Sequence, residues 1–227
     1  MKAFWLNKKH NPNLIVFFAG WSFDENPFKS LKYDRFDVLI VYDYNDLKSP
    51  KELSETKNYE SKILLSWSMG VFASYVLRDL FVDFDKKIAI NGTVTPVDNE
   101  YGIPVRMFEL TLKYCKKSLD NQFYRNIFLT DAEYEKYCKN PVVRSIQSRV
   151  EELSSLYELI KKSDFVYKKF YDFAYISNFD KIIPSKNQIN SHNKNKIPFL
   201  LLPFGHCLFY NFTCWSEIIN ADRLQKY

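Results

Sequence analysis

Six short apolar runs, each bounded by turn residues, constrain the fold of this chain more than any other feature. They read LIVFFAG (14–20), DVLIVYD (37–43), ILLSWS (63–68), KIAING (87–92), FAYIS (173–177) and PFLLLPFG (198–205). Strands that are apolar on both faces are typical of a parallel sheet covered by helices on each side. The sequence therefore predicts an α/β fold with a mostly parallel sheet of about six strands.

Helical stretches lie between these runs and are expected at 49–57, 69–81 and 207–224. Strand, helix and strand in alternation predict right-handed crossovers. The polar tract 185–196 is expected to be a solvated loop or short helix, because Asn and Lys dominate it.

The interval 105–170 departs from this alternation. Residues 105–128 and 143–162 read as successive amphipathic helices with no strand between them. We expect residues 1–227 to form a single domain that carries a helical insertion, or lid, over about 105–170.

Composition narrows the class of protein further. The 227 residues are 46% hydrophobic and 26% charged, which excludes a disordered chain and a bundle of membrane spans, and a net charge of +5 does not favour a nucleic-acid partner. The four cysteines form no C-x-x-C pair and no metal spacing with the three histidines. The N-terminal residues lack the pattern of a signal peptide. We expect a cytoplasmic monomer with reduced thiols, no metal and no cofactor.

The string SWSMG, residues 66–70, is the most informative short motif. It ends an expected strand and opens an expected helix, with Ser68 at the turn. This is the context of a nucleophile elbow, with S-x-S-x-G where G-x-S-x-G is usual. The alternative is that Ser68 only caps the following helix.

A serine nucleophile needs a histidine base and an orienting carboxylate, in the chain order Ser, Asp, His. His206 follows the last expected strand, whereas His10 and His192 lie in polar segments and are expected to be solvated. Asp180 follows the strand at 173–177, whereas Asp172 precedes it. Ser68, Asp180 and His206 are therefore the candidate catalytic residues.

The candidate oxyanion hole consists of two backbone N–H groups. In this arrangement the residue after the nucleophile supplies one, and a loop after an early strand supplies the other. Met69 follows Ser68, and Trp21 follows the strand that ends at Gly20. Trp21 is alternatively an aromatic residue of the core or the pocket rim.

Four blocks together resemble a known family: FFAGW (17–21), WSMGVF (67–72), FDKIIP (179–184) and GHCLFY (205–210). The chain is similar to the BioG-type pimeloyl-[acyl-carrier protein] methyl ester esterases, which are α/β-hydrolases of biotin synthesis. The resemblance implies Ser68, Asp180 and His206 as the triad and Trp21 and Met69 as oxyanion donors. It also implies hydrolysis of a pimeloyl methyl ester held on acyl carrier protein. Ser66 and Ser22 depart from glycines that are usual in this pattern.

Charge is concentrated on the expected insertion. Residues 101–170 contain 13 Lys and Arg against 9 Asp and Glu, while the rest of the chain has 19 against 18. Such a surface would steer an acidic carrier protein, with Arg125, Arg144 and Arg149 as candidate docking residues. Further candidates are Arg106, Lys113, Lys116 and Lys117. Each charge is alternatively part of a solvated helix face.

Apolar residues of the same interval are candidates for the walls of an acyl pocket: Phe108, Leu112, Phe123, Tyr124, Ile127 and Phe128. They are alternatively the core of the insertion itself. Rival functions are another serine esterase or thioesterase on the same fold, a catalytically silent binding module, and a basic nucleic-acid binder.

Overall fold

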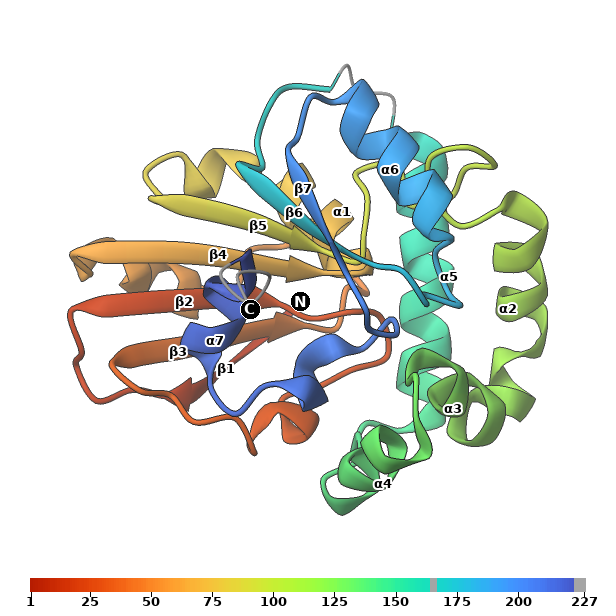
Figure 1. Ribbon diagram of the computed structural model, residues 1–227, viewed down its shortest axis with the longest axis horizontal. Coiled ribbons are helices and arrows are strands. Elements are labelled where there is room, and N and C mark those ends of the chain that lie inside the picture. Colours follow the sequence, from red (N-terminus) through yellow and green to blue (C-terminus); the bar gives the residue numbers. More distant parts are fainter. Residues whose placement is uncertain (164–166, 223–227) are drawn as a thin grey trace.

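The computed structural model describes residues 1–163 and 167–222, without the side chains at 118, 120 and 121. In these residues one sheet of seven strands has the order β1-β3-β2-β4-β5-β6-β7 (Figure 1). The strands are β1 (Lys2–Asn7), β2 (Asn13–Phe18), β3 (Phe36–Tyr42), β4 (Ser61–Trp67), β5 (Lys86–Ile90), β6 (Phe173–Ser177) and β7 (Phe199–Leu202). The six strands from β2 to β7 run parallel to one another. The expected mostly parallel sheet is confirmed.

The edge strand β1 is the element of the sheet that the sequence analysis did not anticipate. It pairs antiparallel with β3, and its side chains alternate between more and less exposed positions, with Phe4 41% exposed. An antiparallel edge strand needs only one buried face. The search for runs apolar on both faces therefore missed it.

Helices cover the sheet and extend beyond one end of it. They are α1 (Met69–Val76), α2 (Val105–Ser118), α3 (Tyr124–Ile127), α4 (Asp131–Lys139), α5 (Ile146–Lys162), α6 (Ser185–Lys194) and α7 (Trp215–Ile219). Short 3₁₀ helices occur at Asn26–Phe28, Lys51–Asn58, Arg78–Phe81 and Leu208–Asn211. The helix expected at 49–57 is thus a 3₁₀ helix, and the one expected at 69–81 is α1 followed by a 3₁₀ turn. No helix in the described part of the chain is both long enough and apolar enough to cross a bilayer.

The single helix expected at 207–224 is wrong within the described residues, which end at 222. The chain forms a 3₁₀ turn at Leu208–Asn211 and then extends before α7 begins. In the extended part the Thr213 carbonyl accepts from the Lys32 amide, and the Trp215 amide donates to the Lys32 carbonyl. Pairing with a distant segment therefore breaks the helix that the local pattern predicted.

The polar tract 185–196 is also different from expectation, because α6 buries one of its faces. Gln188 and His192 are at most 2% exposed, and the buried Asn187 donates to the Gly102 carbonyl at 2.8 Å. Polar side chains can be buried where they find hydrogen-bond partners. The polar composition of this tract therefore led to the wrong prediction that it is solvated.

The insertion comprises α2 to α5 and lies between β5 and β6 in the chain. Figure 1 shows these helices gathered beyond the end of the sheet to which the parallel strands point. The helix expected over 105–128 is interrupted by a π-helical turn at Leu119–Phe123. Helix α4 was not expected, and a reciprocal capping box of Thr130 and Glu133 begins it.

Candidate active site

Ser68 lies at the sharp turn between β4 and α1. Its backbone has φ 55° and ψ −123°, a region in which a residue with a Cβ is strained. Its side chain makes no cap hydrogen bond with α1. The capping alternative for this serine is therefore wrong.

Two glycines, Gly70 and Gly92, allow neighbouring segments of backbone to lie close to this turn. A Cβ at Gly70 would lie 2.4 Å from the Phe18 carbonyl oxygen, and a Cβ at Gly92 would lie 2.5 Å from that of Ser68. Both positions thus require glycine. Ser66 has room for its hydroxyl, which lies 2.8 Å from the Ser74 hydroxyl inside the core. The departure from glycine at residue 66 is accommodated by this hydrogen bond.

The three candidate catalytic side chains form one continuous chain of hydrogen bonds. His206 Nε2 lies 2.9 Å from Ser68 Oγ, and His206 Nδ1 lies 2.8 Å from Asp180 Oδ2. Ser68 and His206 are 6% and 3% exposed. The structure thus brings together the three residues that the sequence singled out, from loops after β4, β6 and β7.

The Asp180 carboxylate is held on both oxygens. Oδ1 accepts from the backbone amides of Ile182 and Ile183 at 2.8 and 2.9 Å. Oδ2 accepts from Gln188 Nε2 at 2.9 Å in addition to its contact with His206. These donors fix the orientation of the carboxylate toward the imidazole. The alternative Asp172 directly precedes β6, at the end of the strand opposite to the site, and accepts from the Lys87 amide.

Two residues that sequence reasoning missed hold the backbone of His206. Trp67 Nε1 donates to the His206 carbonyl at 2.9 Å, and Asn91 Nδ2 donates to it at 2.8 Å. Asn91 Oδ1 also accepts from the Ser177 amide at 2.7 Å. Asn91 follows β5 and has a φ of 43°. Asparagine is common in the left-handed region, so an asparagine at the end of a predicted strand was the sequence signal that could have indicated this residue.

The expected oxyanion donors line the same cavity as Ser68. The Met69 amide lies in the first turn of α1, where N–H groups have no intrahelical acceptor. Trp21 lies in a turn closed by a hydrogen bond from the Phe23 amide to the Gly20 carbonyl. The Trp21 indole N–H donates to the Arg149 carbonyl of α5 at 2.7 Å. Both residues therefore line the same cavity as Ser68.

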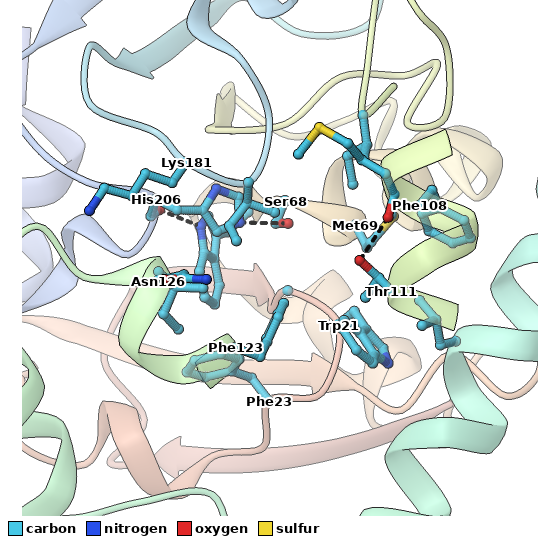
Figure 2. Close-up of a pocket in the computed structure, with 17 residues that line it drawn as sticks. Trp21, Phe23, Ser68, Met69, Phe108, Thr111, Phe123, Asn126, Lys181 and His206 are labelled. Carbon is cyan, nitrogen blue, oxygen red and sulfur yellow. Dashed lines mark hydrogen bonds between the residues drawn. The ribbon is translucent and has the colours of Figure 1, made fainter. Parts of the chain in front are cut away.

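A cavity of about 170 Å³ opens beside Ser68 and His206. Figure 2 shows these two side chains facing Trp21, Phe108 and Thr111 across it. Of the six apolar residues expected to wall a pocket, Phe108, Phe123 and Ile127 line it, and Leu112, Tyr124 and Phe128 are not among its lining residues. The insertion therefore supplies one side of the cavity, which is mostly apolar and suits an acyl chain.

The structure shows that two of the three candidate docking residues, Arg144 and Arg149, are buried and cannot have that role. The Arg144 side chain is 6% exposed and forms ion pairs with Asp43 and Glu152. Arg149 is 4% exposed, and its guanidinium donates to the Tyr124 hydroxyl at 2.9 Å. Buried cations cannot present their charge to a partner surface. Arg125 remains exposed, although it pairs with Asp131.

His10 is exposed, as expected, but His192 is not. His192 packs in α6 against Phe199. Burial lowers its pKa to about 4, and a backbone contact with Gly92 opposes this shift only in part. In residues 1–163 and 167–222 no three His, Cys, Asp or Glu side chains are arranged to hold a metal ion.

Fold and site together put the chain among the α/β-hydrolases, as a hydrolase of the serine type. A lipase-esterase related protein of Clostridium acetobutylicum has the same fold, with a TM-score of 0.61 over 100% of this chain and 98% of that one at 14% identity. The family is more specific. Residues 1–218 match the family described as pimeloyl-ACP methyl esterase BioG, so the chain belongs to that family of biotin-synthesis esterases.

A solved structure agrees with this assignment, and a second relative carries a different name. The crystal structure of BioG from Haemophilus influenzae is 29% identical and superposes with a TM-score of 0.85, over 96% of this chain and 99% of that one. A Bacteroides fragilis protein named malonyl-[acyl-carrier protein] O-methyltransferase is 35% identical over 184 residues. Those residues are 79% of this chain, but they span only 36% of the Bacteroides protein.

Proposed function

We propose that this chain hydrolyses the methyl ester of a pimeloyl group carried by acyl carrier protein, with Ser68 as nucleophile, His206 as general base and Asp180 as the orienting carboxylate. The observation that supports these roles most strongly is the unbroken chain of hydrogen bonds from Asp180 through His206 to Ser68 at a strained elbow. The family assignment supports the substrate.

In the acylation half-reaction, Ser68 Oγ attacks the ester carbonyl while His206 Nε2 takes the hydroxyl proton. The Trp21 and Met69 amides donate to the oxyanion of the tetrahedral intermediate. His206 then gives its proton to the methoxy oxygen, and methanol leaves. Asp180 holds the imidazolium through Nδ1 in this step.

In the deacylation half-reaction, His206 takes a proton from a water molecule, which attacks the acyl-enzyme carbonyl. The intermediate then collapses with Ser68 Oγ as the leaving group, and Ser68 Oγ takes back its proton from His206. The product is the pimeloyl carrier protein with a free terminal carboxylate. Ser68 and His206 carry the transferred protons in both half-reactions and return to their starting states, while the product carboxylic acid releases its own proton to solvent.

Two observations support a carrier-bound substrate. The Bacteroides relative, part of which is similar to this chain, is named for methylating an acyl group on a carrier protein. An esterase that removes such a methyl group would meet the same kind of carrier. In addition, the exposed side of α2 combines Arg106 and Lys113 with Met107 and Leu110, which are 46% and 47% exposed. We infer that this face of α2, with Arg125, receives the acidic carrier.

We also propose a domain organisation and a cellular compartment for this protein. Residues 1–227 form a single hydrolase domain in which α2 to α5 act as a lid over the cavity. The four cysteines are free thiols, which supports a reducing compartment such as the cytoplasm.

Mass spectrometry of pimeloyl-carrier-protein methyl ester before and after incubation tests the function. The wild type should remove one methyl group, leaving the acyl chain on the carrier, and Ser68→Ala should not. Loss of the whole acyl chain by the wild type would indicate a thioesterase instead. No reaction, with a small ester hydrolysed normally, would indicate an esterase for another substrate.

A further inference from the structure

The loop that carries the Trp21 amide is strained where the sequence departs from the usual pattern. Gly20 to Phe23 form a tight turn, and Ser22 within it has φ 72°. Glycine usually takes a positive φ in such a turn, because a side chain there is strained. Ser22 therefore needs support from outside the turn, and it is completely buried.

Glu152 of α5 supplies that support to the backbone. Its Oε2 accepts from the Ser22 amide at 3.3 Å, and its Oε1 accepts from the Tyr44 amide at 2.9 Å. Glu152 is itself 0% exposed. One carboxylate of the insertion thus binds two loops, the one after β2 and the one after β3.

Arg144 keeps this buried carboxylate paired. Its Nη1 lies 2.7 Å from Glu152 Oε2 and donates to the Phe23 carbonyl at 3.2 Å. Its Nη2 lies 2.9 Å from Asp43. Both terminal nitrogens of Arg144 and both carboxylate oxygens of Glu152 make such contacts, and several contacts on each side chain restrict the geometry of a buried ion pair. Arg144 and Glu152 therefore form a rigid bracket around the turn.

A second set of contacts reaches the same loop from the insertion. The Ser22 hydroxyl lies 3.0 Å from the Tyr124 hydroxyl, which accepts from Arg149. The Trp21 indole donates to the Arg149 carbonyl. Trp21 and Ser22, the two central residues of the turn, are thus both held by the insertion.

We propose that Glu152 is a positioning residue that fixes the oxyanion loop, so that the insertion completes the catalytic machinery as well as covering it. This inference rests on the proposed function in one respect, the role of the Trp21 amide as oxyanion donor. Glu152 does not touch the substrate in this account. It acts through the Ser22 amide, one peptide from the Trp21 amide.

The test compares Glu152→Gln with Glu151→Gln, a matched change at an exposed position of the same helix, where the carboxylate accepts from Gln147. A carboxamide accepts at only one of its two ends, so Glu152→Gln loses the bond to either the Ser22 or the Tyr44 amide and part of the pairing with Arg144. Each variant is assayed on p-nitrophenyl acetate, with its melting temperature and its affinity for a trifluoromethyl ketone, whose adduct with a serine carries an oxyanion.

We expect Glu152→Gln to lower kcat by about 10- to 100-fold, less than the loss of a whole oxyanion donor. KM should stay within about twofold, and affinity for the ketone should fall by the same factor as kcat. Glu151→Gln should match the wild type. A folded Glu152→Gln enzyme with unchanged kcat, or one in which only KM rises, would overturn the proposal.

Glu152→Asp decides the matter if Glu152→Gln does not fold. It keeps a carboxylate opposite Arg144 but withdraws it from the Ser22 amide, and the same fall in kcat is expected. Failure of the proposed function is distinguishable, because it shows in the wild type as a carrier-bound methyl ester left intact. In that case the effect of Glu152 on the small ester still reports on the oxyanion loop.

Discussion

At the residue scale, Ser68 shows a conflict between stability and chemistry. Its φ of 55° and ψ of −123° are unfavourable for any residue with a Cβ, yet they aim the hydroxyl at His206. Glycine tolerates this conformation best. The nucleophile therefore occupies a position where backbone physics favours a residue that cannot react.

We predict that Ser68→Ala and Ser68→Gly both lose activity, by about 10⁴- to 10⁶-fold in kcat. Ser68→Gly should nevertheless be more stable than Ser68→Ala by about 1 kcal/mol, because it releases the strain. Activity assays and thermal unfolding of the two variants measure both effects. Residual turnover above a tenth of wild type in either variant would remove Ser68 from its role.

His192 gives a prediction about acid stability. Its pKa in the folded protein is about 4, below the ordinary value near 6.5. The unfolded chain therefore binds a proton between these values that the folded protein does not. Stability from this group is complete above about pH 6.5 and is lost as the pH falls toward 4, by up to about 3 kcal/mol.

Replacing His192 with Gln should remove most of that pH dependence, while His10→Gln, at an exposed position, should leave it unchanged. Urea denaturation of the three proteins at pH 7 and pH 5 provides the comparison. The same loss of stability on acidification in His192→Gln and in the wild type would contradict the assignment of this effect to His192.

At the scale of elements, the insertion has an inner charged layer and an outer one with different tasks. Arg144 is buried between Asp43 and Glu152, whereas Arg106 and Lys113 lie on the exposed side of α2. Sequence alone counts these charges equally. Only burial separates the cations that hold the insertion together from those that can meet a partner.

The inner layer predicts that Arg144→Glu is destabilising by about 3–5 kcal/mol, since it buries a negative charge beside two others. Hydrolysis of a small ester should fall together with hydrolysis of the carrier substrate. Arg125→Glu breaks an exposed ion pair and should change stability by no more than about 1 kcal/mol. Chemical denaturation compares the free energies of unfolding of the two variants. An Arg144→Glu protein as stable as the wild type would contradict a structural role for Arg144.

The outer layer predicts a selective effect on the carrier. Reversing Arg106 and Lys113 to Glu should raise KM for the carrier-bound ester, mainly through slower association, and leave kcat and the small ester almost unchanged. The control is Lys57→Glu, an exposed reversal in the 3₁₀ helix that precedes β4, at the opposite end of the sheet. An equal rise in KM for the control would mean that net charge, and not the α2 face, attracts the carrier.

At the scale of the whole molecule, the sheet explains why so much of the site could be predicted. Ser68, Asp180 and His206 follow three strands whose carboxyl ends meet at one edge, and their order along the chain is the order that the fold requires. Local patterns were sufficient to find these strands. Strand β1, which the sequence did not predict, lies at the opposite edge of the sheet from β7. Its omission from the prediction therefore did not affect the predicted site.

What could not be predicted depends on contacts between distant segments. Asn91 reaches His206 across 115 positions, and Glu152 reaches Ser22 across 130. Neither pairing leaves a periodic or compositional signal in the sequence. The burial of Arg149 and His192 was missed for the same reason, because a polar residue is hidden only when the remainder of the fold closes over it.

The close packing around the elbow limits which nucleophile this scaffold can accept. With Gly70 and Gly92 already pressed against carbonyl oxygens, the backbone at residue 68 cannot retreat from His206, and the serine hydroxyl already lies 2.9 Å from the imidazole. A thiol has a longer bond to carbon and a larger atom at its end. Exchange of serine for cysteine therefore brings a larger atom against the imidazole, and the side chains of residues 68 and 206, rather than the backbone of the turn, have to adjust.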